Sequence, residues 1–367
     1  MFDSRPYLDR LEALCDVEHV KAAEARQLAS GRWQAANRRP TIVTCYDSMR
    51  HIRYEWPPDW PQFPRSEFAN DPGKMLVAEL AEAYEGALLR DDRAYTVRAD
   101  YGAVIIPSLF GCKYVEEGNE MPWLEHLPSL KAVEALIDAG MPELRAGLGR
   151  KVEETEQYFL EMIAPYEKLS QVVHVGCPDT QAPFNLAASI IGSQIYLAVY
   201  DNPGLVHTLL RLVTDTCLEF TKSHKRNVGE EMNKSYIMGW CTDGGIRIVD
   251  DSAVNLSEEM YREFCVPYNT QLSRAFDGFI GHFCGRGGQI LEAMLSITGI
   301  RALNFGNPEM QDWNLVAAAA SRSGACLLWD GDIPLEGDNI TTGIVHKHFA
   351  FTWAEAVETA KSILEEQ

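Results

Sequence analysis

His282 and Cys284 are the residues of this sequence whose types and spacing point most directly to metal chemistry. One residue, Phe283, separates them at the end of an apolar run at residues 279–284. Alternate side chains of a strand point to the same face, so the two could bind one ion together. An imidazole and a thiolate suit Zn²⁺, which favours N and S ligands in tetrahedral geometry. The alternative is a buried cysteine beside a histidine that hydrogen-bonds a backbone carbonyl.

A zinc site needs further ligands, and other apolar runs are followed by suitable residues. We expect His346 to be the third ligand, with His348 as its alternative, and Glu309 could be an exchangeable fourth. Solvated loop positions are the other interpretation of the two histidines. Cys241 is a weaker candidate. Cys326 begins its apolar run, at the end of the strand away from the chemistry, and is interpreted as a core residue.

The elements that must position these residues alternate between strands and helices. Strands are expected at residues 41–45, 103–107, 172–177, 236–241, 279–284, 302–306, 326–330 and 341–345. Helices are expected at residues 73–89, 184–199, 203–225, 257–275, 288–297, 312–321 and 353–366, with two more helical stretches in 129–167. Such alternation indicates an α/β fold with a parallel sheet. It favours a (β/α)8 TIM barrel over a doubly wound fold, because no Gly-x-Gly-x-x-Gly follows an early strand.

In a TIM barrel the chemistry lies at the carboxyl ends of the strands. That rule adds Asp179, Asp243 and Asp330 as candidate catalytic carboxylates, because each follows or ends an expected strand. We expect one domain over residues 1–367, with residues 1–70 as a helical and loop extension packed on the barrel. The proline- and tryptophan-rich segment 54–64 is expected to be an ordered loop, either covering the barrel mouth or packing the extension against the barrel.

The composition excludes several classes of function. A net charge of -20 argues against a nucleic-acid partner, which needs clustered Lys and Arg. The N-terminal residues contain no apolar signal region, and no run approaches the roughly 18 apolar residues of a membrane span. Nine cysteines scattered singly do not form a disulfide pattern, which favours the cytoplasm. A monomer or a homodimer is expected.

Several segments together carry a family resemblance over most of residues 70–367. These are Gln181-Ala-Pro-Phe-Asn-Leu186; Leu256-Ser-Glu-Glu-Met-Tyr-Arg-Glu-Phe264 with Pro267-Tyr268; His282-Phe-Cys284-Gly285; and Asp330-Gly-Asp-Ile-Pro334. The chain resembles the uroporphyrinogen decarboxylase superfamily, and within it the methylcobamide:coenzyme M methyltransferases. The arginine motif of the true decarboxylases is replaced here by Thr44-Cys-Tyr-Asp-Ser-Met-Arg50.

The resemblance implies a zinc-dependent transfer of a methyl group from a methyl-corrinoid, carried by a separate protein, to a small thiol. His282 and Cys284 match two zinc ligands of that branch, and its third, a cysteine, falls at or near His346. Arg50, Arg98 and Arg286 could hold an anionic group of the acceptor, with surface salt bridges as the alternative. Gln181 lies in the matching segment and is expected to contact substrate. The alternative functions are a metal-free tetrapyrrole-handling lyase and a non-catalytic corrinoid-binding protein.

Overall fold

The fold is built around parallel strands, as the computed structural model of residues 2–35, 38–47, 52–334 and 340–365 shows. Six strands form one parallel sheet in the order β1-β14-β13-β12-β11-β10. Their bounds are β1 Thr41–Thr44, β10 Ile246–Val249, β11 Phe279–Phe283, β12 Ile300–Phe305, β13 Cys326–Asp330 and β14 Ile344–Phe349. A second parallel pair joins β4 (Tyr95–Val97) to β7 (Val173–Val175). The predicted α/β class and parallel sheet are confirmed.

Closure of the strands into an eight-stranded barrel stays a prediction. Within the described ranges, the strand ladders do not join the β4–β7 pair to the six-stranded sheet. Single hydrogen bonds run between the two at both edges: Asp92 N, just before β4, donates to Thr41 O of β1. Ala182 N, after β7, donates to Val249 O of β10. The two edges of the large sheet therefore face the small pair, an arrangement that a barrel would have.

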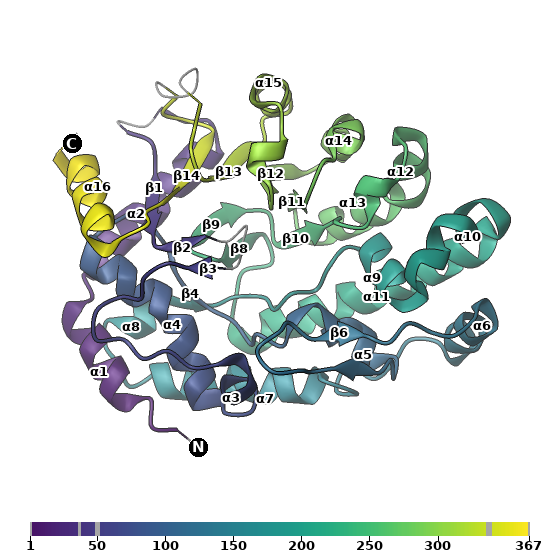
Figure 1. The fold of residues 1–367 in the computed structure, drawn as a ribbon, viewed down its shortest axis with the longest axis horizontal. Coiled ribbons are helices and arrows are strands. Elements are labelled where there is room, and N and C mark those ends of the chain that lie inside the picture. The colour runs from purple at the N-terminus through teal and green to yellow at the C-terminus, as the bar shows by residue number, and fades with distance from the viewer. Residues whose placement is uncertain (1, 36–37, 48–51, 335–339, 366–367) are drawn as a thin grey trace.

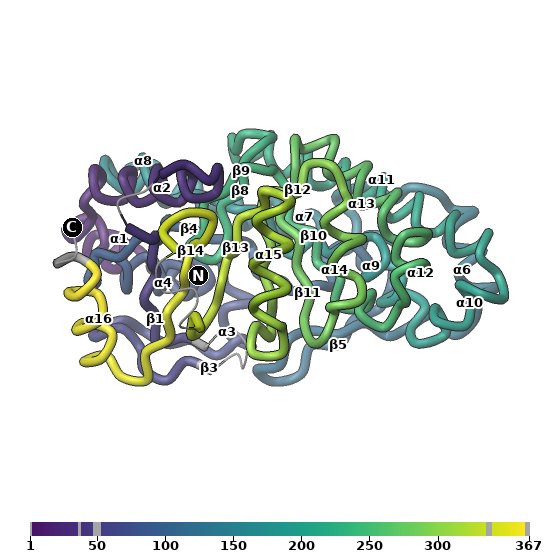
Figure 2. The backbone as a smooth tube through the Cα atoms, turned by 90° about the horizontal axis from the view of Figure 1, so that it is seen from above, coloured from purple at the N-terminus to yellow at the C-terminus, as the bar shows by residue number. Residues whose placement is uncertain are grey.

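Helices cover the outside of the sheet and continue as a bundle away from it (Figure 1; Figure 2). The longer helices are α1 Arg5–Leu14, α2 Val17–Gly31, α4 Pro72–Leu89, α6 Leu130–Ala139, α7 Gly149–Ile163, α9 Pro183–Ile191, α11 Pro203–Val228, α13 Val266–Ala275, α14 Gly288–Leu295, α15 Trp313–Ser323 and α16 Trp353–Glu365. Shorter ones are α3 Arg65–Phe68, η1 Gly102–Val104, α5 Ile105–Leu109, α8 Leu169–Val172, η2 Gly192–Gln194, α10 Ile195–Asp201, η3 Ala253–Asn255, α12 Glu258–Phe264 and η4 Pro308–Met310. No helix in these ranges combines the length and apolar character that crossing a bilayer requires.

Two expected strands are wrong. Residues 236–241 span the tip of an antiparallel hairpin, which pairs β8 (Lys234–Ile237) with β9 (Trp240–Asp243). Met238 and Gly239 both adopt positive φ, 52° and 81°, which is the backbone that a two-residue hairpin turn of the primed type requires. Residues 103–107 belong to η1 and α5. Two further short hairpins, β2 Tyr46–Asp47 with β3 Ile52–Arg53 and β5 Tyr114–Val115 with β6 Trp123–Leu124, lie in loops.

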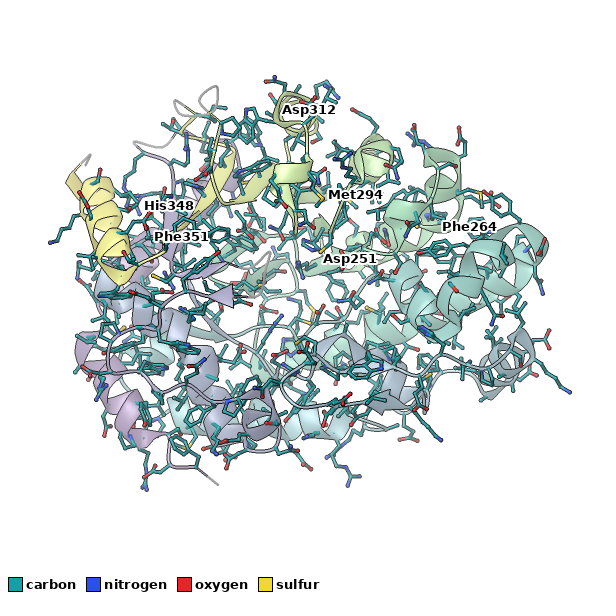
Figure 3. The ribbon with its side chains drawn as sticks, viewed as in Figure 1. Asp251, Phe264, Met294, Asp312, His348 and Phe351 are labelled. Atoms are coloured by element: carbon teal, nitrogen blue, oxygen red, sulfur yellow. The ribbon has the colours of Figure 1, made fainter. Side chains whose placement is uncertain are left out.

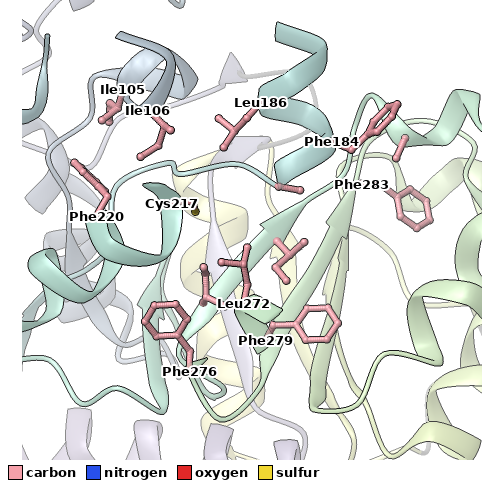
Figure 4. Close-up of a cluster of buried hydrophobic side chains, with 14 of the residues drawn as sticks. Ile105, Ile106, Phe184, Leu186, Cys217, Phe220, Leu272, Phe276, Phe279 and Phe283 are labelled. Carbon is pink, nitrogen blue, oxygen red and sulfur yellow. The ribbon is translucent and has the colours of Figure 1, made fainter. Parts of the chain in front are cut away.

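Alternating side chains divide the core between the two faces of the sheet. Ile280, Ala302, Leu328 and Val345 cluster on one face with Trp240 of the hairpin. The intervening residues pack with the helices in the main core, part of which Figure 4 shows around Phe279, Phe283 and Leu272. Each fully buried side chain of this kind contributes about 1.5–3 kcal/mol to folding. We call the face that carries Ile280 and Val345 the inner face.

The N-terminal segment is tied to the sheet by buried polar contacts. Arg26 and Arg38 both form ion pairs with Asp92, whose side chain is fully buried. Ser30 of α2 donates a hydrogen bond to Ile344 O at the start of β14. β1 itself lies within residues 1–70, so that segment supplies a strand of the main sheet as well as covering helices.

Candidate metal centre

Three residues of different chemistry meet at the carboxyl ends of β10 and β11. Asp251 follows β10, His282 lies in β11, and Cys284 comes directly after β11. His282 Nε2 lies 3.5 Å from Cys284 Sγ and 3.7 Å from Asp251 Oδ1. Ligand atoms of all three fall within 4.8 Å of one another, and Figure 3 places Asp251 at the centre of the molecule. We call this set the HCD cluster.

The His282 ring is oriented by Asn304 of the neighbouring strand β12. Asn304 Nδ2 donates to Leu328 O at 3.0 Å, so its Oδ1 faces His282 and accepts from Nδ1–H at 2.6 Å. Burial, and then the nearby Arg247 guanidinium, hold the pKa of His282 well below its usual range. The imidazole is therefore neutral, with the Nε2 lone pair directed at Asp251 and Cys284. A hydrogen bond to the second ring nitrogen commonly fixes the orientation of a metal-binding histidine in this way.

The Asp251 side chain is held by the backbone directly after β11. Its Oδ1 accepts from Cys284 N at 2.7 Å. The preceding residue, Asp250, is fully buried, and its Oδ2 accepts from Tyr261 Oη and Asn269 Nδ2, both at 2.7 Å. Asp250 N also donates to His282 O. These bonds lock the Asp250–Asp251 turn against β11, and they give the α12 and α13 segments a direct role in placing the cluster.

A second chain of hydrogen bonds reaches the same turn from the loop after β7. Ser252 N donates to Asn185 Oδ1 at 2.6 Å, Asn185 Nδ2 donates to Gln181 Oε1, and Gln181 Nε2 donates to Asp179 Oδ1. Gln181 and Asn185 are buried, and Gln181 has a positive φ of 60°. The segment around Gln181 therefore orients Asp179 and the Asp251 turn together.

The donor set fits Zn²⁺. Zinc bonds of about 2.0–2.3 Å in a tetrahedron put neighbouring ligand atoms about 3.3–3.8 Å apart. The distances of His282 Nε2 from Cys284 Sγ, 3.5 Å, and from Asp251 Oδ1, 3.7 Å, lie within that range. Loss of water around the sulfur, and then the Asp251 carboxylate, raise the pKa of the Cys284 thiol to about 12. The cluster therefore needs a cation to hold Cys284 as a thiolate. Burial also raises the pKa of Asp251.

Arg247 is a cation beside the HCD cluster that the sequence did not reveal. It lies on β10, and its charge lowers the pKa of His282 and acts on Asp251, Cys284 and Asp179. Within the described ranges, its Nε has no hydrogen-bond partner. Burial lowers the pKa of Arg247, but the group remains charged at any physiological pH. Arg247 is a half-buried guanidinium whose Nε–H can still bind an anion.

A large cavity of about 910 Å³ lies at the same end of the sheet. It is lined by Arg98 and Asp100 after β4, by Tyr236 and Ile237 of β8, and by Trp56 of the 54–64 loop. Tyr236 and Ile237 also line a water-sized cavity of about 20 Å³ whose lining includes Asp179 and Arg247, so Tyr236 and Ile237 border both cavities. The 54–64 loop both borders this cavity and packs against the rest of the protein, the two roles expected for it. Trp56 lines the cavity, whereas Trp60 is buried and donates to Val77 O.

Inside the cavity wall the charges are largely paired. Arg65 donates to Asp100 at 2.7 Å, and Arg98 Nη2 lies 3.7 Å from Asp100 Oδ1. Glu79 Oε2 accepts from Arg98 N. Burial raises the pKa of Glu79 to about 8, so this carboxyl is protonated near neutral pH and can donate a hydrogen bond.

The structure does not bring His346 to the HCD cluster. Val345 and Lys347 of β14 point to the inner face, as His282 does, so His346 points to the outer face. Its Nε2 lies 2.8 Å from Gly331 O, and β14 is three strand positions from β11, about 14 Å at ordinary strand spacing. His348 shares the outer face and is labelled well away from Asp251 in Figure 3. The third residue beside His282 and Cys284 is therefore Asp251, where we expected His346.

Other expected site residues lie elsewhere. Asp243 ends β9 of the hairpin, beside Ile300 and Cys326 at the amino ends of β12 and β13, where Arg32 binds it at 2.6 and 2.9 Å. Asp243 therefore does not lie at the carboxyl ends of the parallel strands as expected, because residues 236–241 are not a strand of the parallel sheet. Cys241 is in the same hairpin and is buried.

The remaining candidates lie near the carboxyl ends of the strands, as expected, but outside the HCD cluster. Glu309, in η4, accepts from Asn307 Nδ2 at 3.1 Å and is not among the clustered ligand atoms. Asp330 is buried at the carboxyl end of β13, two strands from β11. Arg286 is exposed two residues after Cys284. Arg50 lies outside the described residues. Cys326 is buried on the inner face, which confirms it as a core residue.

Residues 227–328 match the family described as uroporphyrinogen decarboxylase (URO-D). The matched segment includes Arg247, all three residues of the HCD cluster, and Asn304. No curated protein matches the chain. Members of this family are typically enzymes, decarboxylases or methyltransferases, built on TIM barrels. The match therefore supports a relationship of this chain to the uroporphyrinogen decarboxylase superfamily, over the segment that holds its candidate metal centre.

Proposed function

We propose that this protein is a zinc-dependent methyltransferase that moves a methyl group from a methyl-corrinoid, carried on a separate protein, to a small thiol. The observation that carries the proposal is the HCD cluster: N, S and O donors within 4.8 Å of one another, with the imidazole fixed by Asn304. His282, Cys284 and Asp251 would hold the ion and leave one position for the thiol. Bound zinc would lower the pKa of that thiol, so that a thiolate is present at neutral pH.

The residues around the cluster would orient the acceptor. Arg247, half-buried and without a partner at Nε, would bind an anionic group on the acceptor close to its sulfur. Asn304 and the Asp250 network would keep His282 and Asp251 in place without a rearrangement on binding. In the transfer the thiol loses its proton, a sulfur–methyl bond forms, and the cobalt–methyl bond breaks with its electron pair left on the corrinoid.

The large cavity supports a bulky second substrate. Its volume, about 910 Å³, lies at the upper end of ordinary small-molecule sites. Trp56 and Tyr236 in its lining provide flat apolar surfaces for a macrocycle, and Tyr236 also borders the Arg247 cavity. A corrinoid held there would lie on the same side of the sheet as the thiol.

A tetrapyrrole-handling lyase is the second candidate, favoured by the same cavity and by its arginines. A porphyrinogen carries several carboxylates, which need free cations. Arg65 and Arg98 already face Asp100, and Arg53 lies 3.3 Å from the buried Glu85. Because these arginines have carboxylate partners, the cavity favours the methyltransferase. A non-catalytic corrinoid-binding protein would not need the HCD cluster.

Two measurements test the proposal. Purified protein should contain about one zinc per chain, and D251N, H282A and C284S should each lose it, while the distant D243N should keep it. With methylcobalamin and coenzyme M or other small thiols, the wild type should form the methyl thioether and demethylate the cobalamin. Protein without zinc that is inactive with every thiol, or turnover of uroporphyrinogen instead, would contradict the proposal.

A further inference from the structure

Every arginine that lines the large cavity, within the part of the chain that the structure describes, already has a carboxylate partner. Arg65 and Arg98 face Asp100, and Arg53 faces the buried Glu85. A ligand carboxylate would therefore meet no unpaired cation here. N–H donors remain available, because the 3.7 Å contact of Arg98 with Asp100 is longer than a hydrogen bond and the Arg98 side chain is 23% exposed.

The carboxyl groups in the same lining would repel an acid. Glu82 is half-buried, Glu120 is exposed, and neither forms an ion pair with another described residue. Glu79 differs from them, because burial raises its pKa to about 8. Its Oε2 accepts from Arg98 N, which leaves Oε1 to carry the proton and to donate. The cavity therefore offers hydrogen-bond donors and acceptors together, but no free positive charge.

A primary amide fits this mixture of groups. Its N–H₂ donates, its carbonyl oxygen accepts, and it carries no charge. The carbonyl can accept from Arg98 or from protonated Glu79, while the N–H₂ donates to Glu82 or Glu120. A carboxylate in the same place can only accept, would lose part of its hydration, and would lie beside two other carboxylates.

We infer that the large cavity selects its macrocycle by the groups around the ring, and takes a corrinoid edged with amides in preference to the corresponding corrinoid acid. The inference rests on the proposed function, which supplies the corrinoid, and adds the chemistry that selects it. Trp56, Trp123 and Tyr236 provide the apolar contacts for the ring, and the paired charges bind its edge. Trp123 is 45% exposed, so this surface is open to a large ligand.

The probes are cobinamide, whose ring carries amide side chains, and cobyrinic acid, which carries carboxylates in their place, both with the same ligands on cobalt. Equilibrium dialysis with absorbance detection measures their binding to the whole protein. Salt at about 0.3 M screens the long-range effect of the net charge of -20. Cobinamide should bind at least about tenfold more tightly than cobyrinic acid, since one carboxylate placed near Glu82 already costs about that factor.

Two variants of equal net charge separate a local effect from the charge of the whole protein. E82Q removes a carboxylate of the lining and should reduce the preference for cobinamide about fivefold. E219Q removes a carboxylate of α11 that pairs with Lys222 outside the cavity, and should leave the preference unchanged. The inference is overturned if cobinamide does not bind at millimolar concentration, if cobyrinic acid binds as tightly, or if E82Q and E219Q change the preference equally.

These results can be told apart from a failure of the proposed function, because the binding measurement needs neither a thiol nor methyl transfer. A protein that lacks zinc and transfers no methyl group, yet prefers cobinamide, would contradict the methyltransferase and support the amide selection. Methyl transfer by a protein that binds both corrinoids equally would contradict the amide selection alone.

Discussion

Replacing Asn304 tests how the fold prepares the metal centre. Asn304 is 3% exposed and accepts the Nδ1–H of His282 at 2.6 Å, which leaves Nε2 as the ligand atom. N304L removes that acceptor and keeps a side chain of similar size. Loss of such a partner lowers metal affinity about 10–100-fold, or about 1.4–2.7 kcal/mol. Competition against a zinc chelator of known affinity measures the change directly.

The conservative variant N304D separates orientation from stability. An aspartate still accepts from His282 Nδ1–H, so zinc affinity should stay near the wild-type value. It cannot donate to Leu328 O, so the free energy of unfolding should fall by about 1–3 kcal/mol. N255A, at an exposed asparagine that bonds Tyr196, is the control and should change neither property. Wild-type zinc affinity in folded N304L would refute the reasoning.

Three further predictions concern neighbouring groups. R247M should raise KM for an anionic thiol at least tenfold and leave KM for a neutral thiol of similar size unchanged; equal effects on both would contradict an anion-binding role. Burial raises the pKa of Asp250 from 3.8 to about 6, so this group makes wild-type stability fall as pH rises from about 4 to about 6. Urea titrations at about pH 4 and about pH 6 measure the free energy of unfolding of both proteins, and D250N should lack up to about 3 kcal/mol of the fall between them. An identical pH dependence of unfolding in the wild type and D250N would contradict this prediction. R32Q breaks the solvent-accessible ion pair with Asp243 and should lower the free energy of unfolding, measured by thermal unfolding, by no more than about 1 kcal/mol. The zinc content of R32Q should stay at the wild-type value, and loss of zinc would contradict this prediction.

The sequence predicted that His282 and Cys284 lie side by side at a strand end, because the signal for this is local. His282 and Cys284 are two apart at the end of an apolar run, and β11 ends between them, at Phe283. The same reasoning located β12 and β13 to within two residues and identified Cys326 as core. Period-two patterns and strand-end rules need no knowledge of distant contacts.

Asp251 was missed because β10 was missed. Ile246–Val249 is short and interrupted by Arg247, a charged residue that points toward the site, so the run lacked the apolar continuity of the other strands. The available signal was the alternation Ile246-Arg-Ile248 followed by two aspartates. Because this strand was not recognised, Arg247 was not proposed as a site residue either.

His346 and Asp243 failed for different physical reasons. His346 lies at the correct end of its strand, but strand parity directs it to the outer face, and the parity of β14 depends on pairing with β1 and β13. Asp243 was assigned to a parallel strand because the turn at Met238-Gly239 lay hidden in an apolar run. Only the antiparallel pairing with Lys234–Ile237 shows that the chain reverses there.

Anomalous diffraction at the zinc edge, from crystals of the protein purified without added chelator, tests the central claim most directly. We expect one peak per chain, within bonding distance of His282 Nε2, Cys284 Sγ and an Asp251 carboxylate oxygen. A peak at His346 and His348, or none at the HCD cluster, would contradict it.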